Sequence, residues 1–185
     1  MVGITFDDGY LNNLQQALPV LREFGFSATC YAVSNGVGGS TTWDHAKGIV
    51  PKPLMNPAQL RAWQAGGQEV GAHGCDHADL TTLTATAAQQ QIEACKAQLE
   101  AMLDAPVRHF CYPYGRYAPD HAGMVRAAGY ATDTTTRRGR FHPASPGSLL
   151  ELPRVPVWGA TTLAALWLKL ATAYEDRKAV SQATA

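Results

Sequence analysis

The chain has few cysteines, no excess of charge of either sign and no long apolar run. Each of these absences excludes a class of protein or of binding partner. Its 185 residues carry 15 basic and 15 acidic side chains, so the formal net charge is zero. A balanced charge offers no electrostatic footprint for nucleic acid or for an anionic membrane, and we expect neither as a partner. Glycine, charged or polar residues interrupt every apolar stretch well before membrane-spanning length, so we expect no transmembrane segment.

The cysteines are too few and too scattered for a disulfide scaffold. There are four, with no Cys-x-x-Cys pair among them: Cys30, Cys75, Cys95 and Cys111. Such spacing is typical of free thiols in a reducing compartment, and no secretory signal is visible, so we expect a cytoplasmic protein. A segment preceding Met1 would change that expectation, because the first motif begins only a few residues after it. Nothing in the pattern indicates an oligomeric state.

What the sequence does contain is a regular alternation of short apolar runs with helical patterns. The apolar runs typical of buried strands are residues 2–6, 28–33, 69–72, 107–112, 130–135 and 149–157. Apolar residues fall at helical spacing in residues 11–24, 56–66, 84–103, 119–128 and 162–174. This alternation predicts an α/β fold with a parallel sheet, in a single domain over residues 1–175. We expect residues 176–185 to be a polar, frayed tail.

The length predicts a barrel that is not complete. A full eight-unit barrel takes about 250 residues, and this chain is shorter, so we expect an irregular, partly open (β/α) barrel with about seven parallel strands. Functional residues of such barrels lie at the C-terminal ends of the strands. Residues 34–53, rich in Gly, Ser and Thr with Trp43 inside, form a loop whose length is usually functional.

Carboxylates and imidazoles follow two of the predicted strands. Asp7 and Asp8 come directly after the first strand, and His73 and His77 follow the run that ends at residue 72. One Asp and two His at strand ends can form a metal site, which leaves the second Asp beside it as a base. The alternative interpretations are an Asp-Gly turn for the carboxylates and an ordinary surface or core pair for the histidines. Together the two groups favour a metal-dependent hydrolase.

Further candidates follow the later strands. The turn after residue 112 can direct the backbone N–H of Tyr114 toward a reacting centre, although an ordinary aromatic turn would have the same sequence. Arg137, Arg138 and Arg154 could hold a carboxylate or a sugar, and a solvated surface is the alternative for at least one of them. His142 is a candidate proton donor, with an ordinary surface position as its alternative.

These motifs resemble the polysaccharide deacetylase family, also called carbohydrate esterase family four or the nodulation-type N-deacetylase homology domain. The family's first motif, Thr-Phe-Asp-Asp-Gly, is intact at residues 5–9. The second, His-[Ser/Thr]-x-x-His, is matched at residues 73–77 with Gly74 in place of the hydroxyl residue. The third, Arg-x-Pro-Tyr, is matched at residues 111–114 with Cys111 in place of the Arg. The resemblance runs from residue 2 to about residue 158.

The resemblance implies a role for each matched position. Asp7 would be the general base, and Asp8, His73 and His77 would bind one divalent metal, commonly Zn²⁺. The backbone N–H of Tyr114 would help to hold the oxyanion. The metal would polarise the acetamide carbonyl and a water, and Asp7 would take the proton of that water. The implied function is removal of the N-acetyl group from an N-acetylated sugar in a bacterial glycan.

Two departures from the family pattern bear on the mechanism. The Arg that tethers the base in the family is Cys111 here, and the late Leu-x-His motif that supplies the general acid is missing. We therefore expect an arginine, Arg137, Arg138 or Arg154, to take over the tether and His142 to act as the acid. Two alternative functions stay open: a hydrolase of other C–N bonds, such as cyclic ureides or imides, on the same fold, and a non-catalytic carbohydrate-binding relic. The intact Asp7 argues against the relic, and the missing histidine argues for it.

Overall fold

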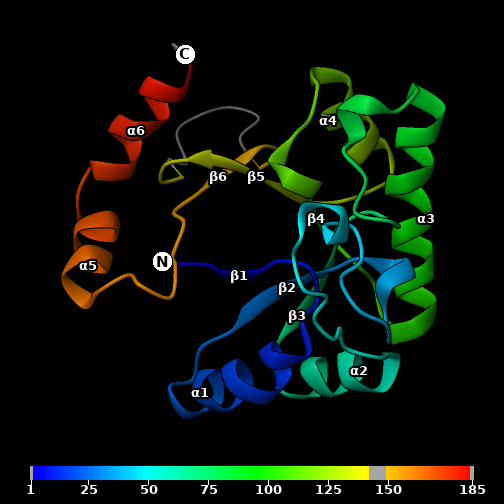
Figure 1. The fold of residues 1–185 in the computed structure, drawn as a ribbon, viewed down its shortest axis with the longest axis horizontal. Coiled ribbons are helices and arrows are strands. Elements are labelled where there is room, and N and C mark those ends of the chain that lie inside the picture. The colour runs from blue at the N-terminus through cyan, green and yellow to red at the C-terminus, as the bar shows by residue number, and fades with distance from the viewer. Residues whose placement is uncertain (1, 142–148, 184–185) are drawn as a thin grey trace.

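A curled sheet of six parallel strands forms the centre of the computed structural model, which describes residues 2–141 and 149–183 (Figure 1). In their order across the sheet the strands are β1 (Ile4–Phe6), β2 (Ala28–Ala32), β3 (Glu69–Ala72), β4 (His109–Cys111), β5 (Thr132–Arg138) and β6 (Leu152–Arg154). Every neighbouring pair is parallel. The sheet ends at β1 on one side and β6 on the other. The predicted α/β class and partly open barrel are confirmed, with six strands where about seven were expected.

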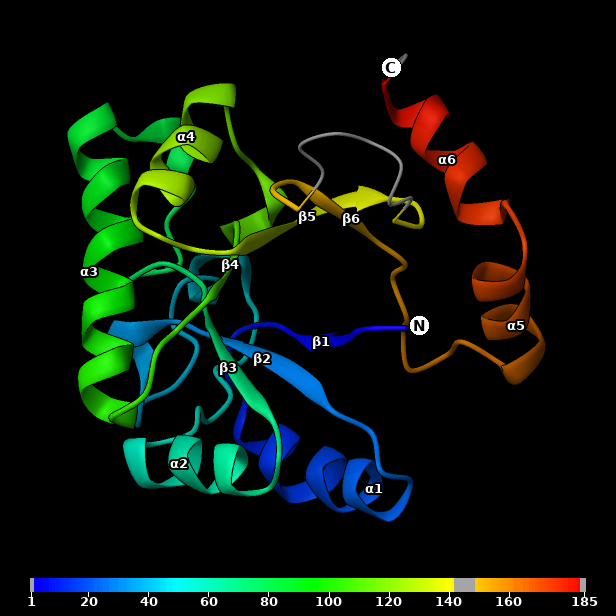
Figure 2. The same cartoon turned by 180° about the vertical axis from the view of Figure 1, so that it is seen from behind.

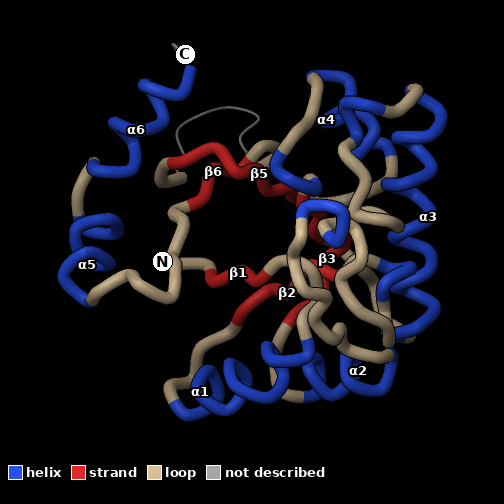
Figure 3. Tube along the Cα trace, viewed as in Figure 1, coloured by secondary structure: helices blue, strands red, loops and turns tan. Residues whose placement is uncertain are grey.

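Helices surround the sheet on its outer side, as the blue tubes around the red strands in Figure 3 show. They are α1 (Leu18–Glu23), α2 (Pro57–Ala65), α3 (Ala85–Leu103), α4 (Pro119–Ala127), α5 (Leu163–Ala171) and α6 (Tyr174–Ala183). In both Figure 1 and Figure 2, α5 and α6 stand apart from the other four helices, and α5 is near the N-terminus. Within the described residues, no helix combines the length and the apolar character needed to cross a bilayer.

Residues 174–183 form helix α6, so this part of the predicted polar tail is helical rather than frayed. Glu175, in the first turn of that helix, is completely buried. Its carboxylate accepts hydrogen bonds from Nε and Nη2 of Arg138 at 2.6 and 2.9 Å, and Nζ of Lys169 lies 3.3 Å away. These ion pairs join α6 to β5 and α5. The sequence pattern missed the helix because its partners are charges that are distant along the chain rather than an apolar stripe.

Aromatic and aliphatic side chains fill the space between the sheet and its helices. The largest completely buried ones include Trp63, Tyr112, Phe110, Leu60, Ile92 and Leu99. Fully burying one such side chain contributes about 1.5–3 kcal/mol. The indole Nε1 of Trp63 donates to the carbonyl of Glu69 at 2.8 Å, which ties α2 to β3. Gly71 in β3 is needed for close packing, since a Cβ there would lie 2.4 Å from the ring of Tyr31.

The parallel arrangement brings the C-terminal ends of the strands to one edge of the sheet. Asp7 follows β1, His73 follows β3, Cys111 ends β4 and Arg154 ends β6. Between β2 and α2 the long loop of residues 34–53 turns back on itself, with Ser40 bridged to Pro53. The candidate residues of the sequence therefore share one end of the half-barrel.

Candidate metal centre and catalytic site

Two imidazoles converge on one carboxylate oxygen at this end of the sheet. Oδ1 of Asp8 lies 3.5 Å from Nε2 of His73 and 3.3 Å from Nε2 of His77. Both histidines are buried, and Nδ1 of His73 lies 2.7 Å from the carbonyl oxygen of Cys111. A hydrogen bond donated by Nδ1–H to this carbonyl fixes the orientation of the ring and leaves the lone pair of Nε2 available to a metal. The structure thus brings together the three residues expected to be metal ligands.

Aromatic rings enclose His77 on two sides. The indole of Trp43 stacks on its imidazole with ring centroids 4.7 Å apart and an angle of 19°. The ring of Tyr114 meets the same imidazole edge-on at 4.4 Å. Tyr114 is held in turn by the loop of residues 34–53, since its hydroxyl donates to Asp44 at 3.2 Å and Nζ of Lys47 lies 4.6 Å above its ring. The loop therefore forms part of the wall of the site.

Three residues around this group of side chains have strained backbone conformations. Asp8, His77 and Tyr114 have left-handed backbones, with φ of 73°, 56° and 57°. Only two other non-glycine residues in the described part of the chain do so, Asp104 and Glu151. Such a conformation costs roughly 1–3 kcal/mol for a non-glycine residue and persists where the surrounding structure enforces it, often at functional sites. The strain supports these turns as a site rather than as ordinary surface turns.

Asp7 is clamped by an arginine from the far end of the sheet. Nη1 of Arg154 donates to Oδ1 of Asp7 at 2.7 Å and Nη2 to Oδ2 at 2.9 Å, while Nε donates to the carbonyl of Thr135 at 2.8 Å. Burial alone would raise the pKa of Asp7, but the hydrogen bonds and charge of Arg154, together with His73, prevail and lower it. Asp7 is therefore ionised and fixed in direction, beside the candidate metal ligands.

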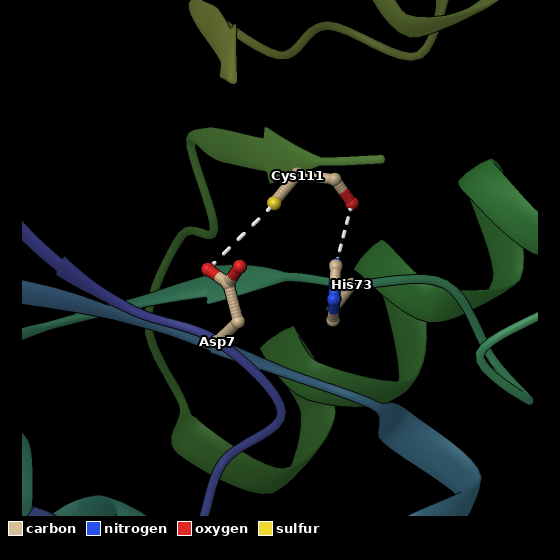
Figure 4. A group of neighbouring side chains, drawn as sticks. All are labelled: Asp7, His73 and Cys111. Carbon is tan, nitrogen blue, oxygen red and sulfur yellow. Dashed lines mark hydrogen bonds between the residues drawn. The ribbon is translucent and has the colours of Figure 1, made fainter. Parts of the chain in front are cut away.

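Cys111 contacts both Asp7 and His73, the first through its sulfur and the second through its backbone carbonyl (Figure 4). Its Sγ is 3.8 Å from Oδ1 of Asp7, and its backbone carbonyl is the partner of His73. Burial and the charge of Asp7 raise the pKa of the Cys111 thiol well above its usual range, so the thiol stays neutral. The side chain itself brings no charge to the site.

Two groups of side chains could hold a metal ion, and His73 belongs to both. Donor atoms of Asp7, His73 and Cys111 lie within 4.8 Å of one another, as do those of Asp8, His73 and His77. In the former group the thiol is protonated and both carboxylate oxygens already accept from Arg154. The group of one carboxylate and two imidazoles is the one that fits a divalent metal, because its donors are not committed to a cation of the protein.

The other predicted arginines lie elsewhere. Nη2 of the exposed Arg137 donates to the carbonyl of Glu151 at 2.8 Å, and Arg138 pairs with Glu175. The third proposed tether, Arg154, is the one that contacts Asp7. His142, the expected acid, lies outside the described residues.

The loop of residues 34–53 was expected to be functional, but no role was predicted for Trp43 or Asp44 within it. A single large aromatic inside a Gly-, Ser- and Thr-rich loop was the available indication. The buried Asp133 was also missed: it accepts from the hydroxyl of Tyr112 at 2.9 Å and from the backbone N–H of Glu151. Burial raises the pKa of Asp133 to about 6. This carboxyl ties β5 to the segment that leads into β6, and so supports the position of Arg154.

Comparisons with known proteins agree on one family. Residues 1–132 match the family model described as polysaccharide deacetylase. The chain is 29% identical over 136 residues to YxkH of Bacillus subtilis (strain 168), which is named as a polysaccharide deacetylase. That alignment covers 74% of this chain and 44% of YxkH, so the chain spans less than half the length of this relative.

Solved structures share the fold. The Streptococcus pyogenes deacetylase PplD, in complex with acetate, superposes with a TM-score of 0.76 at 20% identity, over 90% of this chain and 68% of that one. BC0361, a polysaccharide deacetylase from Bacillus cereus, gives a TM-score of 0.72 at 25% identity, over 88% of this chain and 48% of that one. With a family model that matches most of its length, the chain belongs to the polysaccharide deacetylase family.

Proposed function

We propose that this protein is a metal-dependent hydrolase that removes the N-acetyl group from an N-acetylated sugar of a bacterial glycan. The observation that carries the proposal is the position of an ionised carboxylate, Asp7, clamped by Arg154 beside the donors Asp8, His73 and His77. A pure binding module would need no such base. Membership of the deacetylase family supports the reaction type.

The donor set fits a catalytic metal. Asp8, His73 and His77 offer one carboxylate oxygen and two imidazole nitrogens, a combination that suits Zn²⁺ and leaves positions open for reactants. When bound there, a divalent metal would supply Lewis-acid polarisation of the acetamide carbonyl. The carbonyl of Cys111 holds His73 in the orientation that this role requires.

The remaining steps fall to residues of the chain. Asp7 takes the proton of the water that attacks the acetamide carbon, because an ionised carboxylate keeps lone pairs free after accepting two N–H groups. The backbone N–H of Tyr114 donates to the carbonyl oxygen as that oxygen gains charge. His142 is the proposed donor of the proton that the departing amine needs, so that acetate and a free amine result. Its assignment rests on the sequence alone.

The two adjacent carboxylates provide the test. We expect D7N to keep the metal and to lose about 10²–10⁴-fold in acetate release from N-acetylated glycans, since only the base is removed. D8N should lose metal as well as turnover. Elemental analysis and an acetate assay on a panel of glycans measure both. Equal loss of metal in the two variants would contradict the division of roles. Hydrolysis of cyclic imides without any acetate release would favour the alternative C–N hydrolase.

A further inference from the structure

A pocket of about 190 Å³ lies beside the metal donors without including any of them. Its lining includes Asn35, Thr42 and Trp43 from the long loop, and Cys75 and Asp76 from the turn that carries the two histidines. Trp43 also stacks on His77, and Asp76 directly precedes that histidine. The pocket is therefore the immediate neighbour of the metal centre, and neither the proposed base nor the proposed metal ligands account for it.

We propose that this pocket binds a second sugar unit of the glycan, next to the unit whose acetamide reacts. The inference rests on the proposed function and names a subsite of the same site. A pyranose ring has C–H faces that pack on an aromatic ring and hydroxyl groups around its edge. The pocket combines the matching groups, namely the indole of Trp43 with the carboxylate of Asp76 and the amide of Asn35.

The polar groups of the pocket are fixed in direction before any ligand arrives. Oδ1 of Asp76 accepts from Nδ2 of Asn35 at 2.7 Å, and Oδ2 accepts from Nε2 of Gln91 at 2.7 Å. A carboxylate has about four acceptor positions, so Asp76 can still accept hydrogen bonds from two hydroxyl groups. Its side chain is exposed and within reach of a ligand. Groups that are already oriented lose little freedom on binding, which favours affinity.

The wall of the pocket is joined to the metal-binding turn. The backbone N–H of Asn35 donates to the carbonyl of Cys75 at 3.0 Å, and that of Ser34 to the carbonyl of Gly74 at 3.2 Å. A sugar held against this wall is thus held in a set position relative to His73 and His77. The volume of about 190 Å³ is below the roughly 300–1,000 Å³ of pockets that enclose drug-sized ligands. It suits one ring with its substituents rather than a length of chain.

The proposal is tested with a substitution that fills the pocket with a larger side chain. Thr42 is exposed and lines the pocket, so T42Y places a ring in the space without altering the core. The matched control is V20Y, a β-branched residue on α1 that is 53% exposed and not among the lining residues. Both changes are made in the metal-loaded D7N protein, and binding of N-acetylglucosamine oligomers of one to five units is measured by calorimetry. D7N should slow turnover by about 10²–10⁴-fold, so the oligomers stay intact during the titration and this readout does not depend on deacetylation.

We expect the D7N protein to bind the dimer of N-acetylglucosamine about tenfold more tightly than the monomer, because the second unit adds one set of contacts. Longer oligomers should bind with nearly the same affinity as the dimer. T42Y should remove the difference between monomer and dimer, whereas V20Y should keep it. An affinity that does not depend on chain length, or a T42Y protein that binds like V20Y, would overturn the subsite. Binding that follows the expected pattern, with no acetate release by the wild-type protein, would leave the subsite standing and refute the proposed deacetylation alone.

Discussion

Replacement of Arg154 tests whether the clamp on Asp7 performs the work of the missing family arginine. R154K keeps a positive charge but provides one donor point in place of the planar pair, and it loses the Nε contact with the carbonyl of Thr135. R154A removes the cation altogether. Both changes leave Asp8, His73 and His77 in place, so metal content should be close to that of the wild type.

The size of the effect follows from the exposure of the pair. Breaking a fully buried ion pair costs about 3–5 kcal/mol. The side chains of Arg154 and Asp7 are 19% and 35% exposed, so solvent screens part of the interaction. We expect R154A to lower the free energy of unfolding by about 2 kcal/mol and R154K by about 1 kcal/mol. A base displaced by about 1 Å can lose roughly 10²-fold in rate, and we expect that loss in kcat/KM for R154A.

The pH dependence of kcat/KM distinguishes this role from a merely structural one. Arg154 lowers the pKa of Asp7, so its removal should raise that pKa and move the acid limb of the profile to higher pH. R154K should show a smaller move. R137A serves as the control, because Arg137 donates to the carbonyl of Glu151 instead. If R154A kept the turnover and acid limb of the wild type, the clamp would have no part in catalysis.

Three further changes test other parts of the structure. H73A should reduce the metal content well below one ion per chain in elemental analysis, while H109A, whose ring bonds to Thr132, should not; equal content would contradict the ligand assignment. C111A should keep turnover within a few-fold of the wild type, because its neutral thiol makes only a 3.8 Å contact with Asp7; a loss of 10²-fold or more would give the thiol a role. D133N should flatten the pH dependence of stability. The folded-state pKa of Asp133 is raised from 3.8 to about 6, so its contribution is complete below about pH 4 and disappears as the pH rises through 6. The wild-type free energy of unfolding should thus fall by up to about 3 kcal/mol over that window in denaturant titrations, and an unchanged slope in D133N would refute the account.

The local pattern of the sequence was sufficient to predict the fold class of this protein. Short apolar runs alternating with helical spacing predicted the α/β class and the open barrel, because a parallel strand is buried on both faces and the helices that cover it are apolar on one side. The capped start of α2 could be predicted for the same local reason, since Asn56 and Pro57 satisfy the first turn themselves. The candidate metal ligands were also visible, because Asp8 and His73 lie within two residues of a strand end and His77 follows in the same turn as His73.

Tertiary structure decided which distant charges meet. The sequence offered Arg137, Arg138 and Arg154 as tethers for Asp7 and could not decide among them. The curl of the sheet brings the end of β6 to the end of β1, so Arg154 pairs with Asp7, whereas Arg138 pairs with Glu175. The same holds for Trp43, whose place on His77 depends on how a long loop folds back. Apolar periodicity is a property of neighbouring residues and can be recognised in the sequence. A salt bridge or a ring contact across more than 30 positions depends on a geometry that exists only after the chain has closed.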